Sequence, residues 1–409
     1  MQTNLGLRKG LAIVLWAAAS LGAQQGAGIV WKHLSSKTGD FPPPNAGTEQ
    51  TSATVLDIDK DGVNDFVITE RTAAPAMVWY RRTSRGWDRY LIEAGPLHIE
   101  AGTTFADIDG DGDLDIVAGG DYKTNEVWWW ENPYPNFDPN VPWKRHVVKQ
   151  SGGTQHHDLG FGDFLGDGKK ELVFWNQGSH ALLMAKIPPN PRSAGLWPIT
   201  EIYSYPTNHE PPQRGRAASF KSINQHEGLA VGDVNGDGRP DIVGGGRWFQ
   251  NLGNGRFAAH DIDPGYAFSR AAVGHLLNTG KWAQVVLVMG DGEGPLIWYE
   301  HVNGKWVSHR VADLKSGHTL QLIDFNHDGN LDIFSAEQRL DGANPEAKIY
   351  FFFGDGKGNF RPEVVASGYD SHESKVADLD GNGTLDLLIK PYNYDTPRLD
   401  ILLNMGPKK

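Results

Sequence analysis

An acidic nine-residue phrase returns five times along the chain and constrains the fold more than any other feature. In each copy Asp or Asn occupies alternate positions, a Gly follows at the sixth, and the ninth is Asp. Alternate side chains of such a tight loop point inward, and they suit Ca²⁺, which takes six to eight oxygen ligands. The predicted calcium ligands are Asp57, Asp59, Asp61, Asp65, Asp107, Asp109, Asp111, Asp115, Asp233, Asn235, Asp237, Asp241, Asp324, Asn326, Asp328, Asp332, Asp378, Asp380, Asn382 and Asp386.

Short apolar runs flank these loops, as at residues 104–106 and 116–118, so each loop is expected to join two strands. Two degenerate copies begin at Asp163 and His275. With them the phrase recurs seven times, about every 50 residues, a period typical of propellers and repeat arrays. The predicted fold is therefore all-β: a seven-bladed β-propeller with four strands in each blade.

A second repeated phrase predicts how the ring closes. Aromatic residues mark the third and fourth strands of the blades, as in the phrases that begin at Trp87, Trp143 and Trp306. One copy, at Trp31, stands near the start of the chain, whereas the last repeat ends after its third strand. The N-terminal strand is expected to complete the last blade and leave no unpaired edge. Residues 28–406 should thus form a single propeller domain.

The first 23 residues are predicted to be a signal peptide, with Arg8 and Lys9 before an apolar run and small residues near Ala23. The protein is therefore expected to be secreted or periplasmic; a membrane-anchored N-terminus is the alternative. The chain has no Cys, so Ca²⁺ rather than disulfides would cross-link it. The net charge of −12 and the lack of a basic stripe argue against a nucleic-acid partner. No membrane partner is expected, and the oligomeric state is left open.

Histidines and carboxylates recur six or seven places before the loops, where the innermost strands begin. Inner strands start around the propeller axis, so these side chains should face one another at the mouth opposite the calcium loops. Neutral imidazoles suit Zn²⁺ or another divalent transition metal. The predicted ligands are His156, His226, His318 and His372. The alternative is that these histidines only hydrogen-bond one another or bind a sugar without chemistry.

Other residues of this register are candidates for acid–base and electrostatic roles beside the metal. The predicted catalytic residues are His157, Glu227, Arg270, Glu373 and Lys390. The ends of the second strands return to the same mouth with acids, aromatics and amides, which suit a carbohydrate ligand. The predicted substrate-binding residues are His98, Glu100, Asp121, Trp175, Arg247, Glu337 and Tyr392.

The loop phrases resemble the FG-GAP/VCBS repeats of calcium-loop β-propellers over nearly the whole mature chain. A narrower likeness rests on the segment from Trp128 to Pro133 and on the histidine-led blade starts. These resemble the propeller part of the aldos-2-ulose dehydratase group. That resemblance implies a metal near the axis and the elimination of water from keto-sugars.

Two functional hypotheses follow, since no pair of carboxylates is specific enough to support a third, a hydrolase that uses the acidic residues alone. In the first, the protein is a metal-dependent carbon–oxygen lyase that removes water or an alkoxide next to the keto group of a sugar. In the second, it is a propeller of the adhesion type that binds glycans or proteins without turnover. A histidine cluster at one mouth of the channel favours the enzyme.

Overall fold

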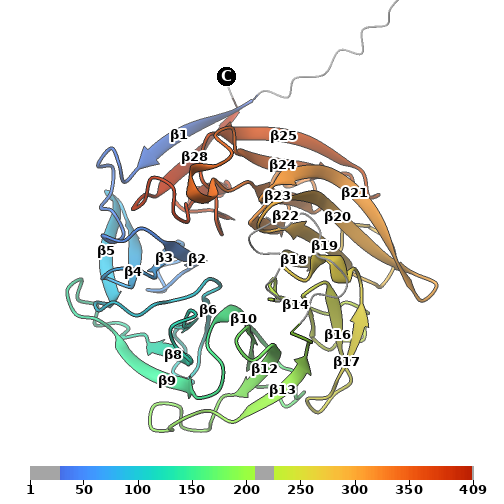
Figure 1. Ribbon diagram of the computed structural model, residues 1–409. Coiled ribbons are helices and arrows are strands. Elements are labelled where there is room, and N and C mark those ends of the chain that lie inside the picture. Colours follow the sequence, from blue (N-terminus) through green and yellow to red (C-terminus); the bar gives the residue numbers. More distant parts are fainter. Residues whose placement is uncertain (1–27, 208–224, 408–409) are drawn as a thin grey trace, which may run out of the picture.

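The computed structural model describes residues 28–207 and 225–407, and its strands form seven antiparallel four-stranded sheets. The sheets follow one another around a common axis (Figure 1). The predicted seven-bladed, all-β propeller is therefore confirmed. The predicted signal peptide, residues 1–23, lies outside the described residues. Within the described part of the chain, no helix has the length and hydropathy needed to cross a bilayer.

Each of the first six blades uses four consecutive strands, from the axis outward. Blades one and two contain β2 (Gln50–Leu56), β3 (Asp65–Glu70), β4 (Met77–Thr83), β5 (Gly86–Glu93), β6 (Thr104–Ala106), β7 (Asp115–Gly119), β8 (Glu126–Glu131) and β9 (Lys144–Gln150). Blades three and four contain β10 (His156–Gly162), β11 (Glu171–Asn176), β12 (Ala181–Lys186), β13 (Ile199–Ser204), β14 (Ala230–Gly232), β15 (Asp241–Gly244), β16 (Arg247–Asn251) and β17 (Phe257–Asp261). Blades five and six contain β18 (Ser269–Gly274), β19 (Gln284–Met289), β20 (Glu293–Val302), β21 (Lys305–Lys315), β22 (Thr319–Ile323), β23 (Asp332–Ala336), β24 (Lys348–Gly354) and β25 (Phe360–Ser367). Two single-turn 3₁₀ helices, η2 (Pro264–Tyr266) and η3 (Leu340–Gly342), lie in connecting segments.

Blade seven is built from both ends of the described chain. It contains β26 (Lys375–Ala377), β27 (Asp386–Ile389), β28 (Asp400–Pro407) and, outermost, β1 (Ile29–Ser35). β1 pairs antiparallel with β28, with Trp31 opposite Asn404 and Ser35 opposite Asp400. In Figure 1 the blue first strand lies along the red last strand. The predicted closure by the N-terminal strand is confirmed, and it leaves the ring without an open seam.

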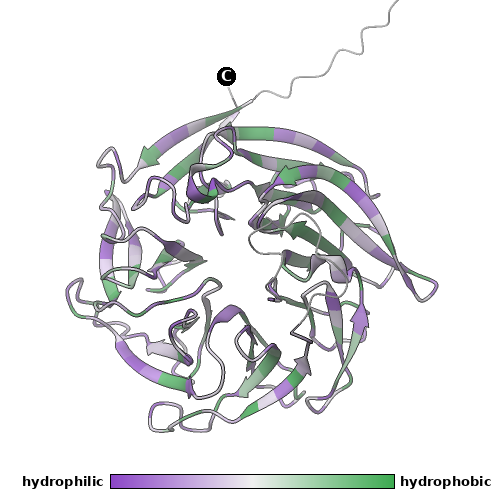
Figure 2. Cartoon of the chain, viewed as in Figure 1, coloured by the Kyte–Doolittle hydropathy of each residue, from purple (hydrophilic) through white to green (hydrophobic). Residues whose placement is uncertain are grey.

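The hydrophobic core is divided into seven clusters, one between each pair of adjacent blades. The period of two in a strand explains this division, because successive side chains point to opposite faces of a sheet. Trp128 and Trp130 of β8 pack toward blade one, whereas Trp129 packs toward blade three. Figure 2 shows hydrophobic residues concentrated in the strands and hydrophilic residues mostly in the connections. The aromatic third strands thus hold neighbouring blades together, and they leave the inner strands free to present polar groups to the axis.

Candidate functional site

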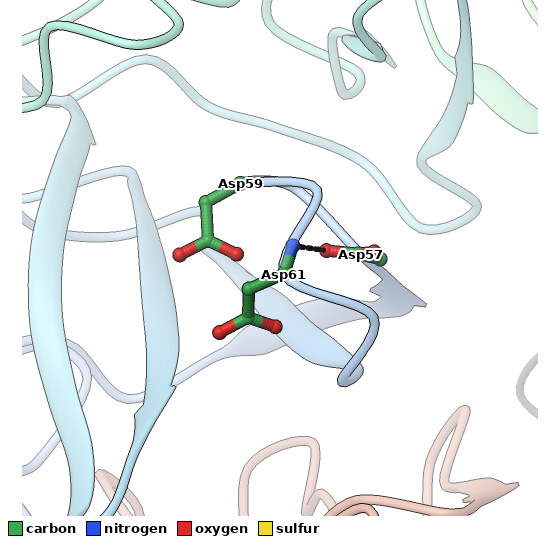
Figure 3. A group of neighbouring side chains, drawn as sticks. All are labelled: Asp57, Asp59 and Asp61. Atoms are coloured by element: carbon green, nitrogen blue, oxygen red, sulfur yellow. Dashed lines mark hydrogen bonds between the residues drawn. The ribbon is translucent and has the colours of Figure 1, made fainter.

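The acidic loops lie between the first and second strands of the blades, at one face of the ring. In blade one the first aspartate organises the turn: Asp57 Oδ1 accepts a hydrogen bond of 3.2 Å from the Asp61 N–H, and Oδ2 accepts one of 2.9 Å from the Gly62 N–H. Figure 3 shows Asp57, Asp59 and Asp61 gathered on this loop. Ligand oxygens of these three residues lie within 4.8 Å of one another. This donor set fits Ca²⁺, which prefers several carboxylate oxygens.

Two further loops bring three carboxylates equally close, the sets being Asp107, Asp109 and Asp115 in blade two and Asp378, Asp380 and Asp386 in blade seven. Burial raises the pKa of Asp115 to about 8, so its negative charge is costly here without a cation. Three of the predicted loops therefore form compact acidic groups that are possible calcium sites.

The loops of blades four and six, in which Asn replaces the second carboxylate, keep the same backbone arrangement. The Asp237 and Gly238 N–H groups donate to Asp233 at 3.0 and 2.8 Å, and the same bonds recur around Asp324 at 3.1 and 2.9 Å. The degenerate loop of blade three repeats the pattern around Asp163. In blade five the side chain of Gln284 accepts hydrogen bonds from the Leu276 and Leu277 N–H groups. A neutral amide therefore takes the place of the last carboxylate in this loop. The prediction, which was based on acidic residues, missed this substitution.

A polar cavity of about 140 Å³ lies at the opposite face, where the inner strands begin. It is lined by Arg71, Glu100, Gln155, His157, Gln225, Glu227, Phe268, Asp291, His318, Gln338, Leu340, His372 and Tyr392. The cavity is smaller than the roughly 300 Å³ at the lower end of ligand pockets, so it admits one end of a larger ligand. We call it the axial pocket.

Glu227 lines the axial pocket and is only 3% exposed. Its Oε1 lies 3.3 Å from His157 Nε2 and accepts a hydrogen bond of 3.3 Å from Gln177 Nε2. Its Oε2 has no hydrogen-bond partner among the described residues, and His318 Nε2 lies 3.8 Å away. Burial raises the pKa of Glu227 to about 7. This carboxyl group can therefore exchange a proton near neutral pH.

His157 lies between two carboxylates. Its Nδ1 donates to Asp158 Oδ2 at 2.9 Å, and its Nε2 faces Glu227. Burial alone lowers the pKa of an imidazole, but the charges of Glu227 and Asp158 outweigh it and raise the pKa of His157 to about 10. His157 is thus held as an imidazolium ion that can donate a proton.

The floor of the axial pocket is a buried layer of ion pairs. Arg270 of β18 binds Asp158 Oδ1 at 2.8 Å and Glu373 Oε1 at 3.0 Å. Glu373 also accepts a hydrogen bond of 2.8 Å from Ser52. Asp158 was not predicted; a bulge in β10 between His157 and Leu159 turns it toward the axis. Only its position directly after two histidines could have drawn attention to it.

His318 and His372 form a second group of imidazoles. Their rings stack at 4.0 Å between centroids, and burial lowers the pKa of both well below the usual value. Lys390 Nζ lies 3.0 Å from His372 Nδ1, and burial lowers the pKa of Lys390 to about 7. Tyr392 stacks on the other side of His372 at 4.9 Å. These two imidazoles are therefore neutral at physiological pH.

Arg71 closes the rim of the axial pocket and is surrounded by acids. It forms ion pairs with Glu100 and with Glu49, the latter at 3.4 Å, and its Nε lies 3.6 Å from Asp121. His98 Nδ1 lies 3.6 Å from the same Asp121 carboxylate and is partly exposed. The predicted residues Glu100, Asp121 and Tyr392 therefore meet around a guanidinium group, with His98 at the edge.

Two of the four predicted transition-metal ligands do not line the axial pocket. His156 Nε2 lies 2.8 Å from Lys149 Nζ and its Nδ1 lies 3.1 Å from the Gly120 carbonyl oxygen, because consecutive strand residues point to opposite sides. His226 stacks on Tyr205 at 3.7 Å, inside the wall between blades three and four. Neither imidazole is among the groups that face Glu227.

Three predicted substrate-binding residues likewise lie away from the axial pocket. Trp175 is buried and donates to the Gly228 carbonyl oxygen at 2.9 Å. Arg247 binds Asp261 at 3.0 Å on the outer strand. Glu337 accepts hydrogen bonds from the Lys315 and Lys348 N–H groups at 2.8 and 3.0 Å. Each of these three side chains therefore bonds to a neighbouring strand or connecting segment and holds the fold together.

The described residues give no compact transition-metal centre. Among the described residues, three His, Cys, Asp or Glu ligand atoms lie within 4.8 Å of one another in the three acidic loops and not at the axis. His157 and His318 each approach Glu227, but His157 lies near its Oε1 and His318 near its Oε2. The donors in their present arrangement do not fit a three-ligand zinc site.

A closed ring of seven four-stranded blades with acidic interstrand loops defines the chain as a calcium-loop type of β-propeller. The FG-GAP-like repeat matches residues 107–174 and 324–389, and the FG-GAP repeat matches residues 227–256. The chain is therefore a β-propeller that carries FG-GAP repeats over these residues, in agreement with the coarser of the two predicted resemblances. No curated protein matches the chain.

Solved structures share the fold at low sequence identity. The BP39L lectin from Burkholderia pseudomallei is 14% identical with a TM-score of 0.56, over 89% of this chain and 98% of the lectin. BBS1N in complex with ARL6DN is 11% identical with a TM-score of 0.54, over 93% and 99%. Rhamnogalacturonan lyase YesW is 13% identical with a TM-score of 0.48, over 90% of this chain and 75% of the lyase. The likenesses to BP39L and BBS1N show the fold alone.

Proposed function

We propose that the protein is an exported carbohydrate-active lyase. In this proposal the axial pocket holds one unit of a keto-sugar and eliminates water, or an alkoxide, next to the keto group. The observation that carries the proposal is Glu227: a buried carboxyl group that lines the axial pocket, with one oxygen that has no hydrogen-bond partner among the described residues, a pKa of about 7, and a proton donor on its other oxygen. A scaffold has no use for such a group, whereas perturbed titration in a pocket is typical of active sites.

The chemistry needs only groups that line the axial pocket. Glu227 Oε2 removes the acidic proton next to the keto group, and the C–H electron pair passes into the enolate. The imidazolium of His157 stabilises the oxyanion by its positive charge. The enolate electrons then form the C=C bond while the C–O bond breaks, and the departing hydroxyl takes the proton from Glu227. The products are an unsaturated keto-sugar and water, and both side chains return to their starting states.

Arg270, Glu373 and Lys390 act indirectly in this proposal. Arg270 holds Asp158, which orients His157 through its Nδ1. Glu373 completes the charge balance of Arg270. Lys390 fixes the ring of His372, against which Tyr392 stacks. The rim residues Glu100 and Arg71 would bind hydroxyl groups.

A divalent transition metal such as Zn²⁺ is a second form of the same proposal. The neutral imidazoles of His318 and His372 beside Glu227 favour it, since metal ligands must be deprotonated. We assign no step to a metal, because the described donors lie too far apart. Metal analysis after exchange into Ca²⁺ buffer tests this form: a stoichiometric metal that disappears in His318→Ala supports it, and its absence removes it.

Incubation with a panel of keto-sugars and plain glycosides, followed by mass spectrometry, tests the elimination through the loss of one water or of an alcohol. Glu227→Gln should lower the rate about 10²- to 10⁴-fold, the usual contribution of a general base. His260→Gln, on an exposed outer strand, is the matched control and should leave it unchanged. Binding of sugars without turnover, equal in wild type and Glu227→Gln, would instead identify a glycan-binding propeller. The lectin of similar fold makes this a natural second outcome.

A further inference from the structure

Arg192 belongs to the connection between β12 and β13 of blade three, and its side chain reaches the acidic loop of blade two. Its Nη2 lies 2.7 Å from Asp109 Oδ2 and 2.5 Å from Asp111 Oδ2, and its Nε lies 2.9 Å from Glu131 Oε1. Asp109 and Asp111 are two of the predicted calcium ligands of this loop. A guanidinium group of the chain itself therefore binds carboxylates that Ca²⁺ would need.

The blade-two loop differs from the blade-one loop in the place of its third acidic residue. Asp61 belongs to the compact acidic group of blade one. Asp111, at the same position, is missing from the compact group of blade two, which consists of Asp107, Asp109 and Asp115. Its Oδ2 pairs with Arg192 instead. The arginine thus holds apart a carboxylate that a calcium ion would gather with the others.

The other two compact acidic groups are not bridged to another blade in this way. In blade one Arg81 binds Asp59, but Arg81 belongs to β4 of the same blade and pairs with that carboxylate alone. In blade seven no cation of the described residues forms an ion pair with the three acids of the group. The contact made by Arg192 is therefore a property of the blade-two loop and not of the repeat.

Arg192 stands in a proline-rich segment, residues 187–198, which contains four Pro. The far end of the segment is fixed, because Trp197 is buried and its N–H donates to the Val148 carbonyl oxygen at 3.0 Å. The turn beside Arg192 is closed by local bonds from the Ser193 and Ala194 N–H groups to the Asn190 carbonyl oxygen. A cavity of about 400 Å³ lies between this segment and the loops of blades two and three. The ion pairs of Arg192 tie the turn to blade two.

We infer that the blade-two loop is a calcium-operated latch for this proline-rich segment. Without Ca²⁺, Arg192 neutralises the loop and holds the segment against blade two. When Ca²⁺ binds, Asp109 and Asp111 turn to the ion, the positive charge of the ion repels the guanidinium group, and the turn of residues 190–194 loosens. The inference rests on the acidic loop and stands whether or not the proposed elimination takes place.

The exposure of Arg192 decides which cation prevails. Its side chain is 43% exposed, and ion pairs at such positions contribute little free energy. Ca²⁺ instead gathers six to eight oxygen ligands at once. A ligand shifts a conformational equilibrium by its differential affinity for the two states, and here Ca²⁺ binds only the state from which Arg192 has left.

Limited digestion with trypsin tests the inference on the unaltered protein, because trypsin cleaves after Arg192 itself. Peptide mass spectrometry follows this cut in Ca²⁺ and in excess chelator, together with the cut after Lys305. Lys305 is exposed at the hairpin turn of blade five, whose loop lacks acidic ligands, so it corrects for the activity of trypsin. Ca²⁺ should accelerate cleavage after Arg192 at least tenfold and cleavage after Lys305 less than twofold. An unchanged or slower cut after Arg192 would overturn the inference.

Two variants locate the ion in the same assay. Asp107→Asn weakens a calcium ligand that forms no ion pair with Arg192, and it should abolish the calcium-induced acceleration. Asp378→Asn, at the same position of the blade-seven loop, is the control and should retain it. An acceleration that survives Asp107→Asn would place the effect of Ca²⁺ elsewhere and contradict the latch.

Isothermal titration with Ca²⁺ tests the competition directly. Arg192→Met removes the competing cation and should strengthen one calcium site at least tenfold. Lys169→Met removes an exposed cation that lines the same cavity, and it should change each affinity less than threefold. Equal effects of the two variants would mean that charge near the loop acts without displacement, and unchanged binding in Arg192→Met would exclude competition; either result would refute the latch.

Discussion

Removal of Ca²⁺ should lower the melting temperature by about 10 °C. The structure supplies three compact acidic groups, and an ion that binds only the folded state at 100 times its Kd stabilises it by about 2.7 kcal/mol. Three such sites contribute about 8 kcal/mol. A chain of this size has an unfolding entropy of about 0.8 kcal/mol/K near its melting temperature, so the loss amounts to about 10 °C.

Differential scanning calorimetry in Ca²⁺ and in excess chelator measures this shift. Re-addition of Ca²⁺ should restore the original melting temperature, whereas Mg²⁺ should not, because Mg²⁺ requires a tighter octahedral site. Asp61→Ala removes one ligand from the blade-one loop and should reduce the chelator-induced shift by about 3 °C, one third of the total. The control is Asp167→Ala, at the same position of the blade-three loop, where Leu165 replaces the second ligand. An unchanged melt in chelator, or equal effects of the two variants, would refute the reasoning.

Further expectations concern pH, ring closure and the core. Elimination activity should rise with pH as Glu227 loses its proton near pH 7, and fall as His157 loses its proton near pH 10. Rate measurements across pH 5 to 11 would check this bell-shaped dependence. A profile flat from pH 5 to 9 would contradict the assignment of Glu227. Trp31→Ala should lower the free energy of unfolding by about 2 kcal/mol in urea titrations, since this half-buried residue packs β1 onto blade six. The control is Met405→Ala, an exposed neighbour, which should change the free energy of unfolding by less than about 0.5 kcal/mol. Phe334→Ala, fully buried between blades six and seven, should cost about 3 to 5 kcal/mol in the same assay, and a cost below about 1 kcal/mol would contradict the packing described.

The architecture could be predicted because the repeated phrases encode local structure. Each loop phrase fixes a turn between two strands. The copy of the fourth-strand phrase at Trp31 stands at the start of the chain, and the last blade is the one blade whose fourth strand is missing from its own repeat. The loop of blade five, which has lost its acidic residues, shows the limit of this reasoning. Gln284 performs the structural task of the final aspartate through its amide oxygen, and an amide carries no acidic signal in the sequence.

The candidate site was predicted less completely, since position along a strand does not fix the direction of a side chain. His156 and His157 are adjacent, so only one of them can face the axis, and the bulge after His157 decides which. His226 lies beyond the strand itself, where stacking on Tyr205 determines its place. In contrast, Glu227, Arg270 and Glu373 come together as expected, because each stands at or just before an inner strand.

Backbone strain at the axial pocket supports a specific role for its ion-pair layer. Both carboxylates that bind Arg270 come from residues in the left-handed region, Asp158 with φ of 48° and Glu373 with φ of 56°. Such a conformation costs a non-glycine residue roughly 1–3 kcal/mol, and it persists only where surrounding contacts enforce it. Asp158 packs closely against Gly102, since a Cβ at that position would lie 2.4 Å from the Asp158 Cα, and the Asp158 N–H donates to the Ala101 carbonyl oxygen at 3.2 Å. A propeller that served only as a scaffold would gain stability from glycine at both strained positions. The chain keeps two carboxylates there, and one of them holds the imidazolium of His157 against Glu227.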